Sequence, residues 1–243
     1  MRTAVSELEA LVAEGDLLEL GVRASRARTH DGVGFLEDGA VLLARPGVEL
    51  PERPPWPRMI HLASDSAEYL LELRARYPGV WVHGPAGLPV DSLALFTSRE
   101  PQERLPEVAT VLYDQESSVL DDLERLARRP RLVGVVLLPA AVGDQVLVEG
   151  ATTWGNRDVS LLAAARILLP HCHVRASWGA LGWKLAQPAV AFGADELAGW
   201  GLEEHLAYPR ARPASGVGRA EVEAGIREAG RIPVEVSRCD WAS

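Results

Sequence analysis

The chain has 243 residues, of which 47% are hydrophobic and 24% charged, and its formal net charge is −9. This length suits one large domain, and the acidic balance argues against nucleic acid, whose phosphates attract a basic surface. No apolar stretch reaches the roughly 18 residues that a membrane span needs, and acidic residues interrupt the first twenty. We therefore expect a cytoplasmic protein with no membrane span and no export signal.

Cysteine usage points to the same compartment. The chain has two cysteines, Cys172 and Cys239, which lie far apart in the sequence. Neither belongs to a pair with metal-ligand or redox spacing. We expect both to be free thiols in a reducing compartment.

The first 58 residues predict a helical lead-in, two strands and a loop. A capping-box spacing at Ser6–Glu9 opens one helix, which breaks near Gly15, and a second helix runs to about Thr29. Val33–Ala44 carries two short apolar runs around an Asp-Gly pair, which is typical of a hairpin. Arg45–Arg58 contains five prolines and is expected to be a linker or a loop over the body.

From residue 59 onwards strands alternate with helices. The predicted strands are Met59–Ala63, Val80–Gly84, Val108–Asp114, Arg131–Pro139 and His173–Ser177. The predicted helices are Ser66–Tyr77, Ser117–Arg129, Asp158–Pro170, Gly179–Gly193 (with a kink at Pro188) and Gly218–Gly230. Such alternation with apolar strands indicates a parallel α/β sheet.

The absence of a dinucleotide fingerprint and of a phosphate-binding loop favours a barrel over a doubly wound sheet. About six β/α units are visible, fewer than the eight of a closed barrel. The sequence predicts a truncated or open (β/α) barrel, with a helical lead-in and a short hairpin, as one domain over residues 1–243.

Five phrases follow one another over about seventy residues of the last third: AARILLP, VRASW, GWKLAQ, FGADELAG and IREAGRIPVE. They resemble the C-terminal region of the radical S-adenosylmethionine enzymes of the futalosine route to menaquinone. That family includes aminodeoxyfutalosine synthase, cyclic dehypoxanthinylfutalosine synthase and deazaflavin-cofactor relatives. The N-terminal stretch ALVAEGDLLELGVRASRARTHDG resembles the helical lead-in before the family's first barrel strand.

The resemblance implies an iron–sulfur cluster that this sequence does not support. In the family a Cys-x-x-x-Cys-x-x-Cys loop follows the first barrel strand, and its three thiolates hold a four-iron cluster whose fourth iron takes S-adenosylmethionine. The corresponding stretch here, LLARPGVELPERPPWPRMIHL, contains no cysteine. Cys172 and Cys239 each stand alone elsewhere. We expect no cluster, no other cofactor and no radical chemistry.

Five residues of the matched region are candidate ligand-binding residues. Trp178 follows a strand and is either a lid over a ligand or a core residue. Lys184, the only lysine, and Gln187 lie three apart on one helix face. Asp195 and Glu196 stand where the family has paired aspartates, and we expect them after a strand, where barrel sites collect. Trp178 and Asp195 are then expected to border one concavity, with Lys184 or Gln187 approaching from the helix.

Two other clusters have simpler explanations. His171 and His173 face one side of a strand, but no carboxylate has a spacing that supplies a third ligand, so we predict no metal site. The stretch HLASDS places His61 near serines without the strand-to-helix elbow of a hydrolase. Helix capping by Asp65 or Ser66 explains it better.

Three functions remain open, of which the third is a purely structural partner that binds no ligand. The first is a cluster-less paralogue of the menaquinone enzymes, which acts as a binding or accessory protein for a futalosine-like nucleoside or for a pathway enzyme. The second is a non-radical lyase or hydrolase acting on such a nucleoside, with Asp195 or Glu196 as general base. An open barrel also leaves a strand edge, which we expect Arg45–Arg58 or a second copy in a homo-oligomer to cover.

Overall fold

The computed structural model describes residues 2–35, 41–50, 59–96, 105–114, 118–140, 155–208 and 216–236. The strands within these ranges are β1 (Gly32–Phe35), β2 (Val41–Ala44), β3 (Met59–Leu62), β4 (Trp81–Gly84), β5 (Ser92–Phe96), β6 (Glu107–Tyr113), β7 (Leu132–Pro139), β8 (His173–Ser177), β9 (Glu196–Ala198) and β10 (Ile232–Glu235). The helices are α1 (Arg2–Glu14), α2 (Leu17–Ala27), α3 (Ala67–Arg76), α4 (Val119–Leu126), α5 (Asn156–Leu168), α6 (Trp178–Leu181), α7 (Trp183–Ala189), α8 (Leu202–Ala207) and α9 (Arg219–Glu228).

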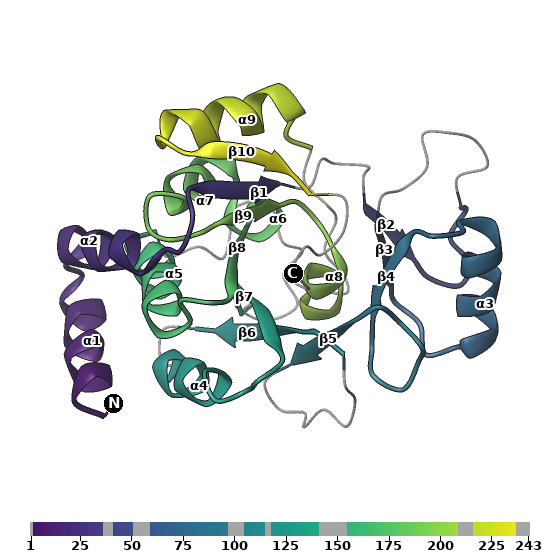
Figure 1. Cartoon of the computed structure of the whole chain (residues 1–243), viewed down its shortest axis with the longest axis horizontal. Helices are drawn as coiled ribbons and strands as arrows, with labels where there is room; N and C mark the ends of the chain where they lie inside the picture. Colours follow the sequence, from purple (N-terminus) through teal and green to yellow (C-terminus); the bar gives the residue numbers. More distant parts are fainter. Residues whose placement is uncertain are drawn as a thin grey trace.

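The strands form one curled, parallel sheet. Their order is β10-β1-β9-β8-β7-β6-β5-β4-β3-β2, and every pair of neighbours is parallel. In Figure 1 this sheet bends into an incomplete ring, with α3, α4, α5 and α9 outside it and α8 inside the curve. The prediction of an open (β/α) barrel is confirmed.

The N-terminal lead-in is also confirmed, but the hairpin is wrong. Helix α1 ends just before Gly15, which has a φ of 68°, and helix α2 begins just after it. The two strands exist, yet β1 pairs in parallel with β9 and β10, whereas β2 pairs in parallel with β3. The Asp-Gly signal reflects only local turn preference. The parallel pairing of β1 and β2 with distant strands, at opposite ends of the sheet, prevents the two strands from forming a hairpin. The turn itself, residues 36–40, lies outside the described residues.

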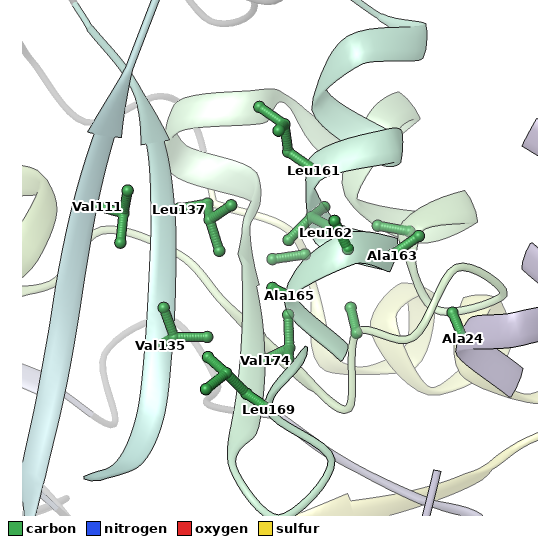
Figure 2. Close-up of a cluster of buried hydrophobic side chains, with 14 of the residues drawn as sticks. Ala24, Val111, Val135, Leu137, Leu161, Leu162, Ala163, Ala165, Leu169 and Val174 are labelled. Atoms are coloured by element: carbon green, nitrogen blue, oxygen red, sulfur yellow. The ribbon is translucent and has the colours of Figure 1, made fainter. Parts of the chain in front are cut away.

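Helix α5 is buried on all sides over most of its length. Every residue from Asp158 to Arg166 is buried, because the helix packs between the sheet and α2. Figure 2 shows Leu161 and Leu162 facing Leu137 of β7, while Ala163 lies on the side of Ala24 of α2. The small alanines of α5 let α2 approach closely, and the polar residues within the buried stretch, Asp158, Ser160 and Arg166, need partners inside the protein.

Later elements depart from the sequence prediction in two places. The helix predicted over Gly179–Gly193 breaks at Gly182, which has a φ of 77°, and not at Pro188, which lies in the last turn of α7. Strands β5, β9 and β10 and helix α8 were not predicted. These elements are short, and Pro233 within β10 weakens a strand signal. No helix in the described part of the chain is long and apolar enough to cross a membrane.

The two edges of the sheet are β2 and β10. Beyond β2, the backbone carbonyls of Arg45 and Leu50 accept hydrogen bonds from Tyr69 and Arg76 of α3. Residues 51–58 of the proline-rich segment lie outside the described residues, so its covering of the edge stays a prediction. Within β10, the side chains of Ile232 and Val234 are exposed.

Candidate functional site

The five sequence-predicted site residues lie in three separate places. Trp178 is buried in the core, where its ring meets that of Trp183 edge-on at 6.0 Å. Lys184 is exposed on α7, and the Gln187 amide donates to Glu228 of α9 at 2.8 Å. Asp195 and Glu196 are buried together at β9.

The expectation that Trp178 and Asp195 border one concavity is wrong. Trp178 follows the carboxyl end of β8, but Asp195 precedes β9 and does not follow a strand. The two residues therefore lie at opposite ends of a parallel sheet. Pattern analysis missed this because β9 has three residues and begins only at Glu196.

A cavity of about 390 Å³ lies at the amino ends of β1, β8 and β9. Its wall includes Asp195 and Glu196, two of the five predicted residues, but not the other three. The remaining lining residues are Thr29, His30, Gly32, Gly34, Arg166, Pro170, His171, Cys172, His173, Val234 and Val236. Such a volume falls within the range of small-molecule sites.

Asp195 is held in this cavity from two sides. Its Oδ1 accepts the Val174 backbone N–H at 2.7 Å and lies 2.7 Å from Nη2 of Arg166. Its Oδ2 lies 3.4 Å from Nε2 of His30 and 3.4 Å from Nδ1 of His173. Burial alone would raise the pKa of Asp195, but the two histidines and Arg166 outweigh burial and hold that pKa below its ordinary value. So acidic a carboxyl is a weak base.

Arg166 links two of the sequence phrases. Its guanidinium donates to the backbone carbonyls of Gly193, Pro170 and Cys172. Gly193 has a φ of 102°, and a Cβ there would lie 2.6 Å from the Arg166 Cβ. The arginine of AARILLP and the glycine and aspartate of FGADELAG therefore form one buried structural unit.

Glu196 takes part in a second polar cluster, inside the barrel. Arg175 of β8 donates from Nε to Glu196 at 2.9 Å and from Nη1 to Glu203 of α8 at 3.2 Å. Nε2 of His83 lies 2.8 Å from the other Glu203 oxygen, and its Nδ1 lies 2.9 Å from Ser92 Oγ. All these side chains are buried. We call this set of Ser92, His83, Arg175, Glu196 and Glu203 the lumen network.

Helix α8 begins against His61 of β3. The Leu202 backbone N–H donates to Nδ1 of His61 at 2.7 Å, and a Cβ on Gly201 would lie 2.8 Å from the same nitrogen. Glycine is therefore needed for this approach. Burial lowers the pKa of His61 to about 3, so the ring is neutral and can accept this bond.

Glu204 is the buried carboxyl with the basic character that Asp195 lacks. Its Oε2 accepts the Gly201 backbone N–H at 2.8 Å. Burial, followed by the charge of neighbouring Glu203, raises the pKa of Glu204 to about 7. Sequence reasoning missed Arg175, His83, Glu203 and Glu204. A signal did exist in the strands, because MIHL and WVHG each carry one titratable side chain in an apolar run and HVRAS carries two, His173 and Arg175, and such groups need buried partners.

The serine-rich stretch after β3 has the capping role that its sequence predicts. Oγ of Ser66 accepts the Tyr69 backbone N–H at 3.2 Å at the start of α3.

No protein-family model matches the chain. A curated relative, 5-amino-6-(D-ribitylamino)uracil–L-tyrosine 4-hydroxyphenyl transferase 2 of Methanosarcina acetivorans, is 32% identical over 163 residues, which is 62% of this chain and 39% of the relative. Aminodeoxyfutalosine synthase of Thermus thermophilus is 31% identical over 144 residues, 54% of this chain and 39% of the relative. The chain is similar to radical S-adenosylmethionine enzymes. The match spans about two fifths of these relatives' own length.

Solved radical S-adenosylmethionine enzymes share the fold. Methylornithine synthase (PylB) superposes with a TM-score of 0.60 at 12% identity, over 95% of this chain and 94% of that one. The FeFe-hydrogenase maturase HydG from Carboxydothermus hydrogenoformans superposes with a TM-score of 0.56 at 11% identity, over 96% of this chain and 79% of that one.

The residues present do not fit the cluster of radical S-adenosylmethionine enzymes. Three thiolates are required, and these 243 residues contain two cysteines. Cys172 is buried at the amino end of β8, where its Sγ donates to the Leu132 carbonyl at 3.4 Å. Burial raises the pKa of Cys172 to about 11, so this sulfur is a thiol and not a thiolate ligand. Cys239 lies outside the described residues.

Proposed function

We propose that this chain is a binding or accessory protein of the futalosine route, which binds a futalosine-like nucleoside and performs no radical chemistry. The resemblance to aminodeoxyfutalosine synthase supports the ligand class. The mismatch between its cysteines and an iron–sulfur cluster supports the absence of radical chemistry.

The observation that carries the proposal is the position of α8. Enzymes with this kind of barrel act at the carboxyl ends of the strands. Here α8 follows the carboxyl end of β9 and bonds through Leu202 to β3, through Glu203 to β4 and β8, and through Tyr208, just after the helix, to the Pro139 carbonyl of β7. The chain's own helix thus occupies the space where substrate would react. The cavity at the amino ends is the candidate ligand site.

The first test concerns iron. Protein made and purified without oxygen is expected to contain no stoichiometric iron or acid-labile sulfide, because two cysteines cannot supply the three thiolates that a cluster needs. Chemical iron and sulfide assays with a visible absorption spectrum measure this. Iron and sulfide near four per chain, with brown absorbance, would refute the proposal.

The second test is a thermal-shift screen with futalosine, its deaminated and adenine-bearing relatives, and S-adenosylmethionine. At least one nucleoside is expected to raise the melting temperature, since a ligand at a hundredfold excess over its dissociation constant stabilises by about 2.7 kcal/mol. S-adenosylmethionine is expected to give no shift, because its anchoring iron has no ligands here. If every nucleoside leaves the melting temperature unchanged at millimolar concentration, the proposed binding function is wrong.

A matched pair of variants on β10 assigns the shift to the cavity. Val234 is exposed and lines the cavity, while Ile232 is exposed on the same strand and does not line it. Val234→Trp should fill the cavity and abolish the nucleoside shift, whereas Ile232→Trp should retain it. Equal shifts of the melting temperature in both variants would show that the ligand binds outside this cavity.

A second candidate function is a non-radical lyase or hydrolase acting on the same nucleoside. The pKa of Glu204, raised to about 7, favours it, because a general base works best when its pKa lies near the working pH. Glu204 replaces Asp195 and Glu196 in that role, since Asp195 is too acidic and Glu196 is paired with Arg175. This function requires the nucleoside to bind at the carboxyl ends of the strands beside α8, because Glu204 does not line the cavity at their amino ends. Product analysis of the same nucleoside mixtures separates the two functions, because only the enzyme changes its ligand.

Compartment and assembly belong to the same proposal. We place the protein in the cytoplasm, beside the enzymes of its route. We further propose that a second copy covers β10, whose Ile232 and Val234 side chains lie exposed at a sheet edge, since bare edges promote association.

A further inference from the structure

We propose that His30, His173 and Asp195 form a binding site for a divalent transition metal, with Zn²⁺ the best fit. This inference goes beyond the proposed function and does not rest on it. The three residues lie at the amino ends of three adjacent strands: His30 precedes β1, Asp195 precedes β9, and His173 opens β8. We call them the His–His–Asp cluster. They are distant in sequence, which is why spacing revealed no third ligand for His173.

The distances suit a metal better than a plain hydrogen-bonded triad. One ligand atom from each residue lies within 4.8 Å of the others. The Asp195 Oδ2 atom is 3.4 Å from a ring nitrogen of each histidine. A tetrahedral zinc with bonds of about 2.0–2.1 Å sets neighbouring ligand atoms about 3.3 Å apart. A charge-assisted hydrogen bond would be shorter, about 2.7–2.9 Å.

The carboxylate is oriented for binding through one oxygen. Its Oδ1 is fixed by the Val174 backbone N–H and by Arg166, while its Oδ2 faces the two histidines. Outer hydrogen bonds of this kind are what hold metal ligands in place. The His30 side chain is 45% exposed, so its ring has room to turn toward an ion.

The surroundings leave coordination positions open. The cluster lines the cavity of about 390 Å³, which has space for water or a ligand group beside the ion. Three protein ligands with an open position are typical of reactive rather than structural zinc sites. Imidazole and carboxylate ligands without a thiolate suit zinc and other first-row metals.

The positive charge of Arg166 opposes a cation, but its position limits the effect. Its Nη2 lies 2.7 Å from Oδ1, whereas the oxygen beside the two histidines is Oδ2. Three backbone carbonyls, those of Gly193, Pro170 and Cys172, fix the rest of the guanidinium. It therefore acts as a positioning residue for Asp195.

The experiment is a calorimetric titration of EDTA-stripped, re-purified protein with Zn²⁺ alone. One equivalent is expected to bind, and Co²⁺ in its place should give the visible absorption of a four- or five-coordinate site. His30→Ala is expected to weaken Zn²⁺ binding by more than the roughly 10–100-fold that loss of an outer-shell partner causes. This residue is half-exposed, so the variant should fold, which its circular dichroism verifies.

The matched control is His171→Ala. His171 lines the same cavity and is exposed, but it does not belong to the His–His–Asp cluster. This variant should keep the wild-type Zn²⁺ affinity. The proposal is overturned if wild-type protein shows no saturable Zn²⁺ binding, or if His171→Ala weakens binding as much as His30→Ala. Because no nucleoside is present, either failure leaves the proposed ligand function separately testable.

Discussion

Replacing Arg175 by methionine is expected to destabilise the protein by about 3–5 kcal/mol, the cost of breaking a buried ion pair from one side. Arg175 is 2% exposed, and it is paired with both Glu196 and Glu203. Methionine fills much of the same volume but leaves two carboxylates buried without that partner. Urea unfolding followed by circular dichroism at neutral pH measures the loss.

The matched control is the same substitution in an exposed ion pair. Arg227 is 58% exposed and pairs with Glu223 along α9. Arg227→Met should cost about 0.5 kcal/mol or less, since helical surface pairs contribute about 0.3–0.5. Similar losses for the two variants would contradict the importance of the lumen network.

A rescue variant separates charge from packing. Adding Glu196→Gln and Glu203→Gln to Arg175→Met removes the two carboxylate charges that have lost Arg175 as a partner. Neutralised buried networks often recover stability, so the triple variant is expected to be more stable than Arg175→Met. If it is less stable instead, lost packing and not unpaired charge explains the first result.

The lumen network also shows what a sequence can and cannot predict here. Apolar strands such as LVGVVLLP indicate their burial directly, because a strand in a parallel sheet must be covered on both faces. The Gly-Asp break between α1 and α2 is equally local. These features were predicted, and with them the class of fold.

The site depends on contacts that no local pattern contains. Glu203 contacts His83, which lies 120 residues away in the sequence. His30 contacts Asp195, which lies 165 residues away in the sequence. Helix α8 has six residues and β9 has three, too few for a periodicity to be visible. For this reason the sequence predicts Asp195 at the wrong end of the sheet, although the phrase FGADELAG that contains it is distinctive.

Asp195→Asn is expected to destabilise the metal-free protein by about 3 kcal/mol, the low end of the cost of breaking a buried ion pair. The substitution is nearly isosteric, and the amide oxygen can still accept the Val174 N–H. It removes the charge that faces Arg166, which is 1% exposed. Asp31→Asn is the matched control, because Asp31 is 73% exposed where it pairs with Arg231, and it should cost about 0.5 kcal/mol or less. Thermal and urea unfolding in EDTA measure both.

The outcome decides what FGADELAG encodes in this chain. A loss near 3 kcal/mol means that the aspartate of this phrase holds AARILLP and the start of β9 together. The phrase then has a structural role in this chain, whether or not it also binds a ligand. A loss below 0.5 kcal/mol would contradict that structural role and would leave Asp195 as a binding residue alone. A coupling test with Arg166→Met completes the argument, since residues in one ion pair give non-additive losses of about 0.5–3 kcal/mol. The double variant should therefore lose less stability than the two single variants combined, because the second change removes a charge that the first has already left unpaired.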